Sequence, residues 1–421
     1  MPDSTVLKPI PEGDRNLGGG DYFLLWAGAA VSLAEIWAGG ALAPLGLTAG
    51  LGAILLGHLI GNTPLALGSL MGCREGLPSM ALTRPALGRY GSYLATGLNV
   101  TQLVGWTAVM VWLGGQAAVN LSRPFGDDSA LWWMILGGGG TTLWALVGRR
   151  FWKILHRVAV SALILMCLHM TWLVLRNLAQ GWPSQPARAD LGFGLGLDLV
   201  IAMPISWLPL AADYSRFART GRGAAWGTWW GYLIVSSWMY SLGLAAALAS
   251  GSSTPETMIM SLLAQGGWLA VALGIVILST LTTTFLDVYS ASISSLNLPL
   301  GLSRRTTTLL AGGLGTLLAL VFSAQAFEPF LLLLGSCFCP LFGLVLADYF
   351  LLGRRKPLPS EENLVGPRFR PVGLVSWGAG VLIYRWALAH DWTMGASLPS
   401  FILAGLIYLT LARLGTTAGK G

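Results

Sequence analysis

Apolar residues in this chain gather into long runs that are separated by short polar stretches. A helix that crosses a bilayer needs about 20 mostly apolar residues, and reading the runs at that length predicts twelve helices. They lie near residues 22–46, 49–72, 93–121, 131–148, 158–178, 191–211, 226–249, 266–296, 307–322, 328–352, 372–389 and 397–412. The loops between them are too short for a soluble domain, so we expect the function to reside within the helical bundle.

The basic residues between these runs predict the orientation. Twelve crossings place both termini on one side of the membrane. If that side is the cytoplasm, only four of the 25 Lys and Arg residues lie outside, and these are Arg123, Arg176, Arg188 and Arg385. Cytoplasmic loops carry an excess of Lys and Arg, and the opposite orientation would invert this bias. We therefore expect a multi-pass protein of the cell membrane with both termini in the cytoplasm.

The composition also indicates a membrane protein. Hydrophobic residues make up 54% of the 421 positions and charged residues only 10%, whereas soluble domains average about 25% charged residues. The net charge of +7 could suggest nucleic acid, but the basic residues are scattered among the apolar runs rather than clustered on one surface. The lipid bilayer is an expected partner, nucleic acid is not, and no obligate protein partner is evident.

The sequence does not favour an enzyme. A membrane-embedded enzyme would need a nucleophile and base, or several metal ligands, that converge in the bundle. The four histidines are scattered along the sequence, and the four cysteines lie in or beside apolar runs without paired spacing. We expect no catalytic residues and no resident cofactor.

Glycine and proline interrupt two of the predicted helices at comparable depth. Residues 35–40 and Pro44 break the first helix, and residues 203–209, with Pro204 and Pro209, break the sixth. The sixth helix also begins a second set of five. Many secondary transporters contain two inverted repeats, whose discontinuous helices expose backbone groups to a substrate near the middle of the membrane. We therefore interpret the chain as a secondary transporter. A channel, the rival interpretation, would need rings of selectivity groups.

Five short motifs carry a family resemblance. They are Trp37-Ala38-Gly39-Gly40, Gly61-Asn62, Thr101-Gln102-Leu103-Val104-Gly105-Trp106, Asp213-Tyr214-Ser215-Arg216-Phe217-Ala218-Arg219 and Tyr289-Ser290-Ala291-Ser292. With them the chain resembles the nucleobase:cation symporter family, in particular its bacterial cytosine permease-like members. Within the family it is most similar to the branch assigned to hydroxymethylpyrimidine, a thiamin precursor. The resemblance implies an all-α integral membrane fold of about twelve helices, with a leucine-transporter-like inverted repeat of five plus five helices and two additional helices.

The expected organisation follows from this resemblance and from the helix ranges. It comprises a cytoplasmic N-terminal segment (1–21), a first five-helix repeat (22–178), a second five-helix repeat (191–352), a basic cytoplasmic loop (353–371), two additional helices (372–412) and a cytoplasmic tail (413–421).

Two tryptophans are the main candidates for substrate contact. Trp106 and Trp207 match the positions between which transporters of this family hold a planar ring. An indole face offers dispersion and quadrupole contacts to a flat heteroaromatic ring, although most tryptophans of a membrane protein lie at interfaces. One turn after Trp106 stands Met110, where some relatives carry a polar side chain that binds the ring, so hydrogen bonds to the substrate must come from elsewhere.

Two acids within the predicted spans are candidates for those hydrogen bonds. A carboxylate at membrane depth costs about 2.5–3.5 kcal/mol on insertion scales, so it normally faces a cavity or a partner. Glu35 and Asp287 are therefore expected to contact the substrate, or else to form a structural pair or to be neutral, hydrogen-bonded acids. Asp198, nearer the outer end of its helix, is expected to line a wet vestibule.

The resemblance also implies a cation site. Thr282 and Thr283 match the two hydroxyl residues that, in sodium-coupled relatives, complete a site with carbonyls of the broken first helix. If that helix is unwound from Ala34 to Trp37, the carbonyls of these two residues are free to join them. Threonines in membrane helices also bond their own i−4 carbonyls, and proton coupling through Glu35 or Asp287 stays open.

The expected function is therefore import of a small pyrimidine, hydroxymethylpyrimidine, with a coupling cation such as sodium, by alternating access. The alternative within the same class is a permease for cytosine or another purine or pyrimidine nucleobase.

Overall fold

The computed structural model describes residues 8–123, 126, 129–147, 152–178, 191–251, 269–353 and 368–418. These residues form helices and 3-10 turns, and a single β-bridge joins Leu17 to Ala218. The predicted segment 1–21 is described from residue 8, and most of the predicted loop 353–371 lies outside the described residues.

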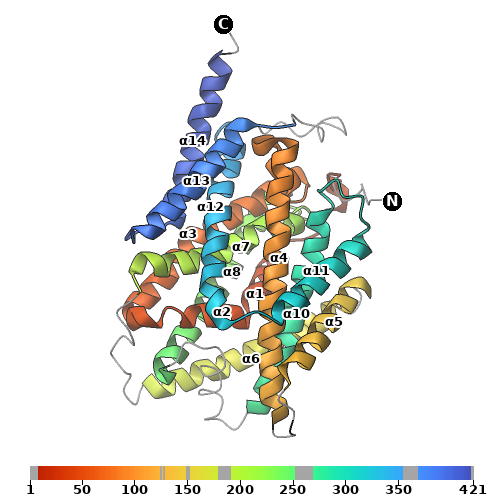
Figure 1. Cartoon of the computed structure of the whole chain (residues 1–421), viewed down its shortest axis with the longest axis vertical. Coiled ribbons are helices and arrows are strands. Elements are labelled where there is room, and N and C mark those ends of the chain that lie inside the picture. Colours follow the sequence, from red (N-terminus) through yellow and green to blue (C-terminus); the bar gives the residue numbers. More distant parts are fainter. Residues whose placement is uncertain are drawn as a thin grey trace.

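The helices run along the chain in the order that the apolar pattern predicts (Figure 1). The first are α1 (Gly19–Ala30), α2 (Leu33–Gly40), α3 (Gly46–Glu75), α4 (Arg84–Ser122), α5 (Ala130–Val147) and α6 (Trp152–Leu178). Next come α7 (Phe193–Ser215), α8 (Gly221–Ser250), α10 (Leu269–Ser295), α11 (Arg304–Ala319) and α12 (Phe327–Phe350). The last are α13 (Pro371–Ala389) and α14 (Ser397–Ala418). Short 3-10 turns lie at Glu12–Asp14, Ala43–Leu45, Ala81–Thr83 and Ala324–Ala326.

Each predicted segment corresponds to a helix, and the first segment is made of α1 and α2 together. Nine helical stretches of the described residues are long and apolar enough to cross a membrane. Neither half of the broken first helix reaches that length alone, and α11 has only 16 residues. At the C-terminus, α14 continues to Ala418, so most of the predicted tail 413–421 is helical.

Helices of the first half pack against their counterparts in the second half. The pairs α2 and α7, α3 and α8, α4 and α10, and α5 and α11 are each in contact. The cross pairs α1 with α8 and α3 with α7 are in contact as well. Helices α13 and α14 pack on α12 at one edge of the bundle (Figure 1). This is the arrangement expected of two repeats that share one core.

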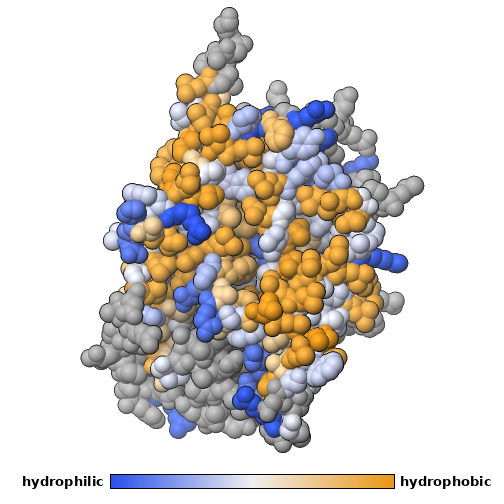
Figure 2. Space-filling model, in the orientation of Figure 1, coloured by the Kyte–Doolittle hydropathy of each residue, from blue (hydrophilic) through white to orange (hydrophobic). Residues whose placement is uncertain are grey.

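The surface of the bundle is apolar. Figure 2 shows broad hydrophobic areas over the helices, and large side chains such as Val147, Leu382 and Leu136 are 71%, 71% and 63% exposed. Polar side chains such as Glu35 and Asp287 lie inside the bundle instead, where they are 1% and 2% exposed. This distribution suits a bilayer, where lipid tails cover the apolar surface.

Glycine brings α2 and α8 close together. A Cβ on Gly39 would collide with the backbone of Tyr240, and a Cβ on Gly243 would collide with the backbone of Ile36. Such small residues let membrane helices approach backbone to backbone. The contact fixes the second half of the broken helix against α8.

The position of the helix break corrects the sequence prediction. The chain leaves helical geometry at Val31 and Ser32, whereas the stretch from Ala34 to Trp37, expected to be unwound, belongs to α2. Ser32 is extended, with φ −146° and ψ 156°, and its hydroxyl accepts a hydrogen bond from the Glu35 N–H at 3.3 Å. This side-chain cap stabilises the start of α2 at residue 33.

The second predicted break is absent. Helix α7 continues from Phe193 to Ser215 and contains both Pro204 and Pro209. Two side chains brace this stretch: the Ser206 hydroxyl donates to the Met203 carbonyl at 2.7 Å, and the Gln102 amide donates to the Ser206 carbonyl at 2.9 Å. Membrane helices tolerate proline where neighbouring groups make up the lost backbone bonds.

Asp198 does not line a wet vestibule. It is 1% exposed, and its carboxylate accepts hydrogen bonds from the N–H groups of Ala396 and Ser397 at 2.7 to 2.9 Å. Asp198 thus caps the start of α14 and ties that helix to α7.

The orientation of the bundle is a prediction that single cysteines test. We expect Arg305→Cys, before the predicted ninth span, to react with a membrane-impermeant maleimide only from the cytoplasmic side. Thr393→Cys, between α13 and α14, should react only from outside. Both positions are exposed, and the four native cysteines would first be replaced. Reaction of the two cysteines from the same side would contradict the twelve-span topology.

Candidate functional site

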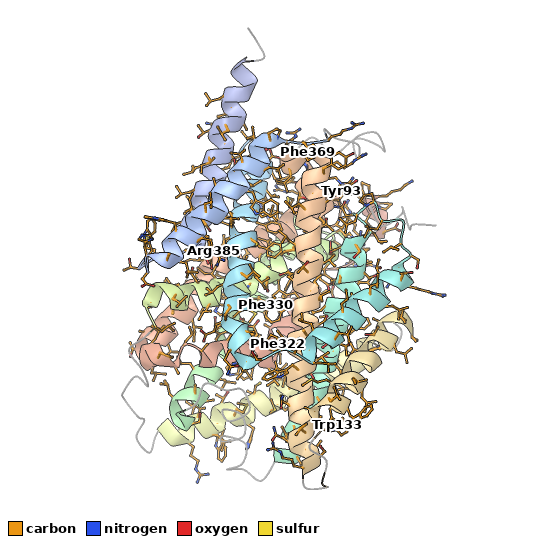
Figure 3. All side chains as sticks on the ribbon, viewed as in Figure 1. Tyr93, Trp133, Phe322, Phe330, Phe369 and Arg385 are labelled. Atoms are coloured by element: carbon orange, nitrogen blue, oxygen red, sulfur yellow. The ribbon has the colours of Figure 1, made fainter. Side chains whose placement is uncertain are left out.

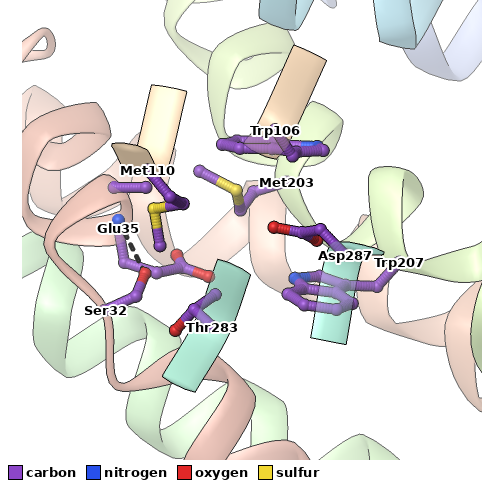
Figure 4. A pocket seen from close by; sticks show the side chains of 9 residues that line it. Ser32, Glu35, Trp106, Met110, Met203, Trp207, Thr283 and Asp287 are labelled. Atoms are coloured by element: carbon purple, nitrogen blue, oxygen red, sulfur yellow. Dashed lines mark hydrogen bonds between the residues drawn. The ribbon is translucent and has the colours of Figure 1, made fainter. Parts of the chain in front are cut away.

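A cavity lies where α2, α4, α7 and α10 meet, and Figure 4 shows the side chains around it. Its volume is about 20 Å³, room for about one water molecule. The lining residues are Ser32, Ala34, Glu35, Trp106, Met110, Met203, Trp207, Thr283 and Asp287. The fold thus brings all five predicted substrate-contacting residues to one cavity, although they are far apart in the sequence. They are Glu35, Trp106, Met110, Trp207 and Asp287.

Trp106 and Trp207 lie on opposite sides of this cavity (Figure 4). Edge-to-face contacts support each indole from behind. The Phe330 ring meets Trp106 at 5.3 Å between centroids, and the Trp26 ring meets Trp207 at 6.0 Å. Figure 3 shows Phe330 of α12 beside α4. These contacts restrict the movement of each indole ring.

Asp287 of α10 lies between the two indole rings (Figure 4). Its side chain is 2% exposed, and its Oδ2 atom has no hydrogen-bond partner among the described residues. A buried carboxyl oxygen without a partner costs about 1–3 kcal/mol or more, so the cavity offers a ligand an unmet hydrogen-bonding group. The structural pair with Glu35 does not satisfy this oxygen, because the Glu35 carboxyl accepts hydrogen bonds from side chains of α8 instead.

Glu35 is held by side chains of α8. The Tyr232 hydroxyl donates to its Oε1 atom at 2.5 Å, and the Ser236 hydroxyl donates to its Oε2 atom at 2.7 Å. The chain of contacts continues to His58 of α3, whose Nε2 atom lies 2.5 Å from the Ser236 hydroxyl and whose Nδ1–H donates to the Ile54 carbonyl at 2.8 Å. Glu35 is therefore a fixed part of the cavity wall.

Only part of the predicted cation site is in place. Trp37 stacks on Phe327 at 3.9 Å between ring centroids, and its carbonyl accepts from the Ala41 N–H at 3.1 Å. The sequence predicted that unwinding would free the carbonyls of Ala34 and Trp37, but both residues lie within the helix α2. The break frees a different carbonyl: the Glu35 N–H bonds to the Ser32 hydroxyl, so Val31 lacks its helical donor.

The two threonines occupy different positions on α10. Thr283 lines the cavity, whereas Thr282 is buried but is not among the lining residues. Both hydroxyls donate to the Ser279 carbonyl, at 2.8 Å from Thr282 and 3.2 Å from Thr283. Both threonines therefore bond to a carbonyl of their own helix, as the alternative allowed. Each hydroxyl oxygen still keeps lone pairs that a cation could use. In the described part of the chain, no three His, Cys, Asp or Glu side chains gather to hold a metal.

Sequence reasoning missed several residues of this region. Ser32 was signalled by its spacing, because Ser32-Leu33-Ala34-Glu35 fits the pattern of a serine that caps a helix three residues before an acid. Met203 lies one turn before Trp207 and shares its face. Tyr232, Ser236 and His58 gave no local signal, since only the packing of α3 and α8 brings them to Glu35.

A membrane helical bundle with a broken helix beside a central cavity is typical of solute transporters. The model of the permease family for cytosine/purines, uracil, thiamine and allantoin matches residues 9–358. The chain belongs to this family. No curated protein matches the sequence significantly.

Solved transporters share the fold. The nucleobase-cation-symport-1 family transporter Mhp1, closed with bromovinylhydantoin bound, is 19% identical, with 98% of this chain and 96% of that chain covered and a TM-score of 0.85. Inward-facing Mhp1 gives 17% identity, coverage of 96% and 93%, and a TM-score of 0.82. A Na+-coupled sialic acid symporter, outward-open and substrate-bound, is 12% identical, with 95% of this chain and 91% of that chain covered and a TM-score of 0.66. These likenesses confirm the fold class; where each repeat begins and ends stays a prediction.

The Glu35 support predicts a stability difference between two adjacent serines. Ser236→Ala removes the hydroxyl that bonds both Glu35 and His58, and we expect it to lower the free energy of unfolding by about 1–3 kcal/mol. Ser237→Ala is the matched control, because the Ser237 hydroxyl is buried without a partner among the described residues. Thermal unfolding in detergent measures both variants. Equal midpoints for Ser236→Ala and Ser237→Ala would contradict the proposed support.

Proposed function

We propose that this permease imports a small pyrimidine together with a cation by alternating access, and that hydroxymethylpyrimidine is the substrate. The observation that carries the proposal is the Asp287 Oδ2 atom, buried without a partner between two indole rings. Family membership supports a nucleobase-like solute, and the alternative substrate is cytosine or another nucleobase.

In this structure the cavity is narrow, with a volume of about 20 Å³, which holds about one water molecule. A pyrimidine ring therefore enters only when the helices that carry Trp106 and Trp207 move apart, as alternating access requires. A ring between Trp106 and Trp207 would expose its edge to Asp287. A 4-aminopyrimidine presents an exocyclic amine beside a ring nitrogen on one edge, and a carboxyl group can accept from the amine or, when protonated, donate to the ring nitrogen.

Sodium is the coupling ion that we propose. The oxygen ligands that we assign to it are the neutral hydroxyls of Thr282 and Thr283 and the backbone carbonyl of Val31, and neutral oxygens of this kind suit Na+. The Na+-coupled sialic acid symporter shares the fold. Thr283 also lies one turn before Asp287 on α10, so the two side chains share a helix face and both line the cavity. A cation at Thr283 would therefore interact electrostatically with a substrate in the cavity.

Asp287 should set the ranking of substrates. We expect wild-type protein to bind hydroxymethylpyrimidine more tightly than cytosine or uracil. Asp287→Asn should lose most of this preference, because removing a buried hydrogen-bond partner costs about 1–3 kcal/mol, while weak ring binding persists. Competition by a pyrimidine panel against one labelled ligand measures both proteins. Tighter binding of cytosine would transfer the assignment to the alternative, and an unchanged ranking in Asp287→Asn would make the acid structural.

Sodium coupling is tested on the adjacent threonines. Thr282→Ala and Thr283→Ala should each raise the sodium concentration for half-maximal uptake, and by a larger factor than they change substrate affinity at saturating sodium. Uptake into proteoliposomes under imposed sodium or proton gradients provides the measurement. Wild-type uptake that follows the proton gradient and ignores sodium would refute the sodium site.

A further inference from the structure

A second cavity adjoins the proposed substrate cavity. It lies between α4, α5 and α10 and has a volume of about 370 Å³. Met110 lines both cavities and is itself only 2% exposed. Met110 is therefore a shared wall of the site between the tryptophans and of a larger space toward α5. Trp133, which also lines this space, marks its end near the C-terminus of α4 (Figure 3).

The second cavity is apolar in its chemistry. Three threonines on its wall have their hydroxyl protons engaged with carbonyls of their own helices. Thr280 donates to Ile277 at 2.8 Å, Thr284 to Thr280 at 2.6 Å, and Thr141 to Gly137 at 2.8 Å. The rest of the wall is glycine and apolar or aromatic side chains. Such a space suits a hydrocarbon group and not a charged or strongly polar one.

Met110 is suited to be a movable wall. An unbranched thioether side chain has three rotatable bonds and adapts its shape to its neighbours more readily than a branched one. A change in the Met110 rotamer therefore alters the wall that the two cavities share. The wall beyond it has room for a larger side chain, because a Cβ on the partly buried Gly137 would meet only Leu281, at 4.0 Å.

We propose that the second cavity is a side pocket that receives an apolar substituent of the substrate ring, with Met110 as the wall that moves to admit it. This inference rests on the proposed pyrimidine site. It assigns to the transporter a wider substrate class, namely pyrimidines that carry a hydrocarbon group on a ring carbon. The competing occupant is a lipid chain, since Leu136 on the wall is 63% exposed.

The test measures how affinity changes as the substituent grows. Pyrimidines with methyl, ethyl, propyl and butyl groups on a ring carbon compete against the labelled parent ring, on purified wild-type protein. Burial of each added methylene should tighten binding about fourfold. Gly137→Leu fills the side pocket and should abolish this gain while parent-ring affinity stays unchanged, because Gly137 does not line the substrate cavity.

Gly139→Leu is the matched control. It adds the same side chain on the same helix, a Cβ there also meets no atom within 4 Å, and Gly139 is not among the residues that line the side pocket. We expect Gly139→Leu to keep the gain of wild type. Gly140→Leu, at the same pocket wall, replaces Gly137→Leu if that variant does not fold.

Three results would overturn the inference, and they are distinguishable. Substituents that weaken binding to wild type would show that Met110 is a fixed wall. A gain that persists in both Gly137→Leu and Gly140→Leu would place the substituent elsewhere and leave the side pocket to lipid. If wild type does not bind the parent ring, the pyrimidine site itself fails, and the side pocket fails with it.

Discussion

A polar group inside a bilayer has no water to bond with, so it must find its partner in the protein or in a ligand, and this constraint governs the centre of the bundle. Ser32 caps the broken helix, and Tyr232 and Ser236 hold Glu35. Asp287 is left with an oxygen that no described residue satisfies. The same rule that stabilises the fold therefore marks the position where a solute is expected to complete it.

The sequence was sufficient for the architecture and less so for local geometry. Span length and apolarity are imposed by the bilayer, so all twelve segments were recognisable in the sequence. Glycine and proline were weaker guides to the helix breaks. Pro204 and Pro209 lie inside a continuous α7, and the true break lies at Val31 and Ser32. A capping serine decides where a helix starts, whereas proline in a packed membrane helix is tolerated.

In the candidate site, too, some residues could be predicted from the sequence and others could not. Trp106, Trp207 and Asp287 were predicted from motifs and lie at one cavity, although their roles stay proposals. The Trp37 carbonyl was expected there, but it is engaged within α2. Contacts such as Ser236 with Glu35 and His58 depend on how α2, α3 and α8 pack. The side pocket beyond Met110 is empty space between three helices, which no sequence pattern records.

If two indole rings clamp a pyrimidine, removing one of them must weaken binding, and one affinity measurement tests this most directly. Equilibrium binding of labelled hydroxymethylpyrimidine is compared between purified wild type, Trp207→Ala and the control Trp226→Ala. In wild type the Trp226 side chain is 59% exposed, on the surface of the bundle. Loss of stacking and buried aromatic area should weaken binding to Trp207→Ala by about 1–3 kcal/mol, and Trp226→Ala should bind as wild type does. Unaltered affinity in a correctly folded Trp207→Ala protein would contradict the account.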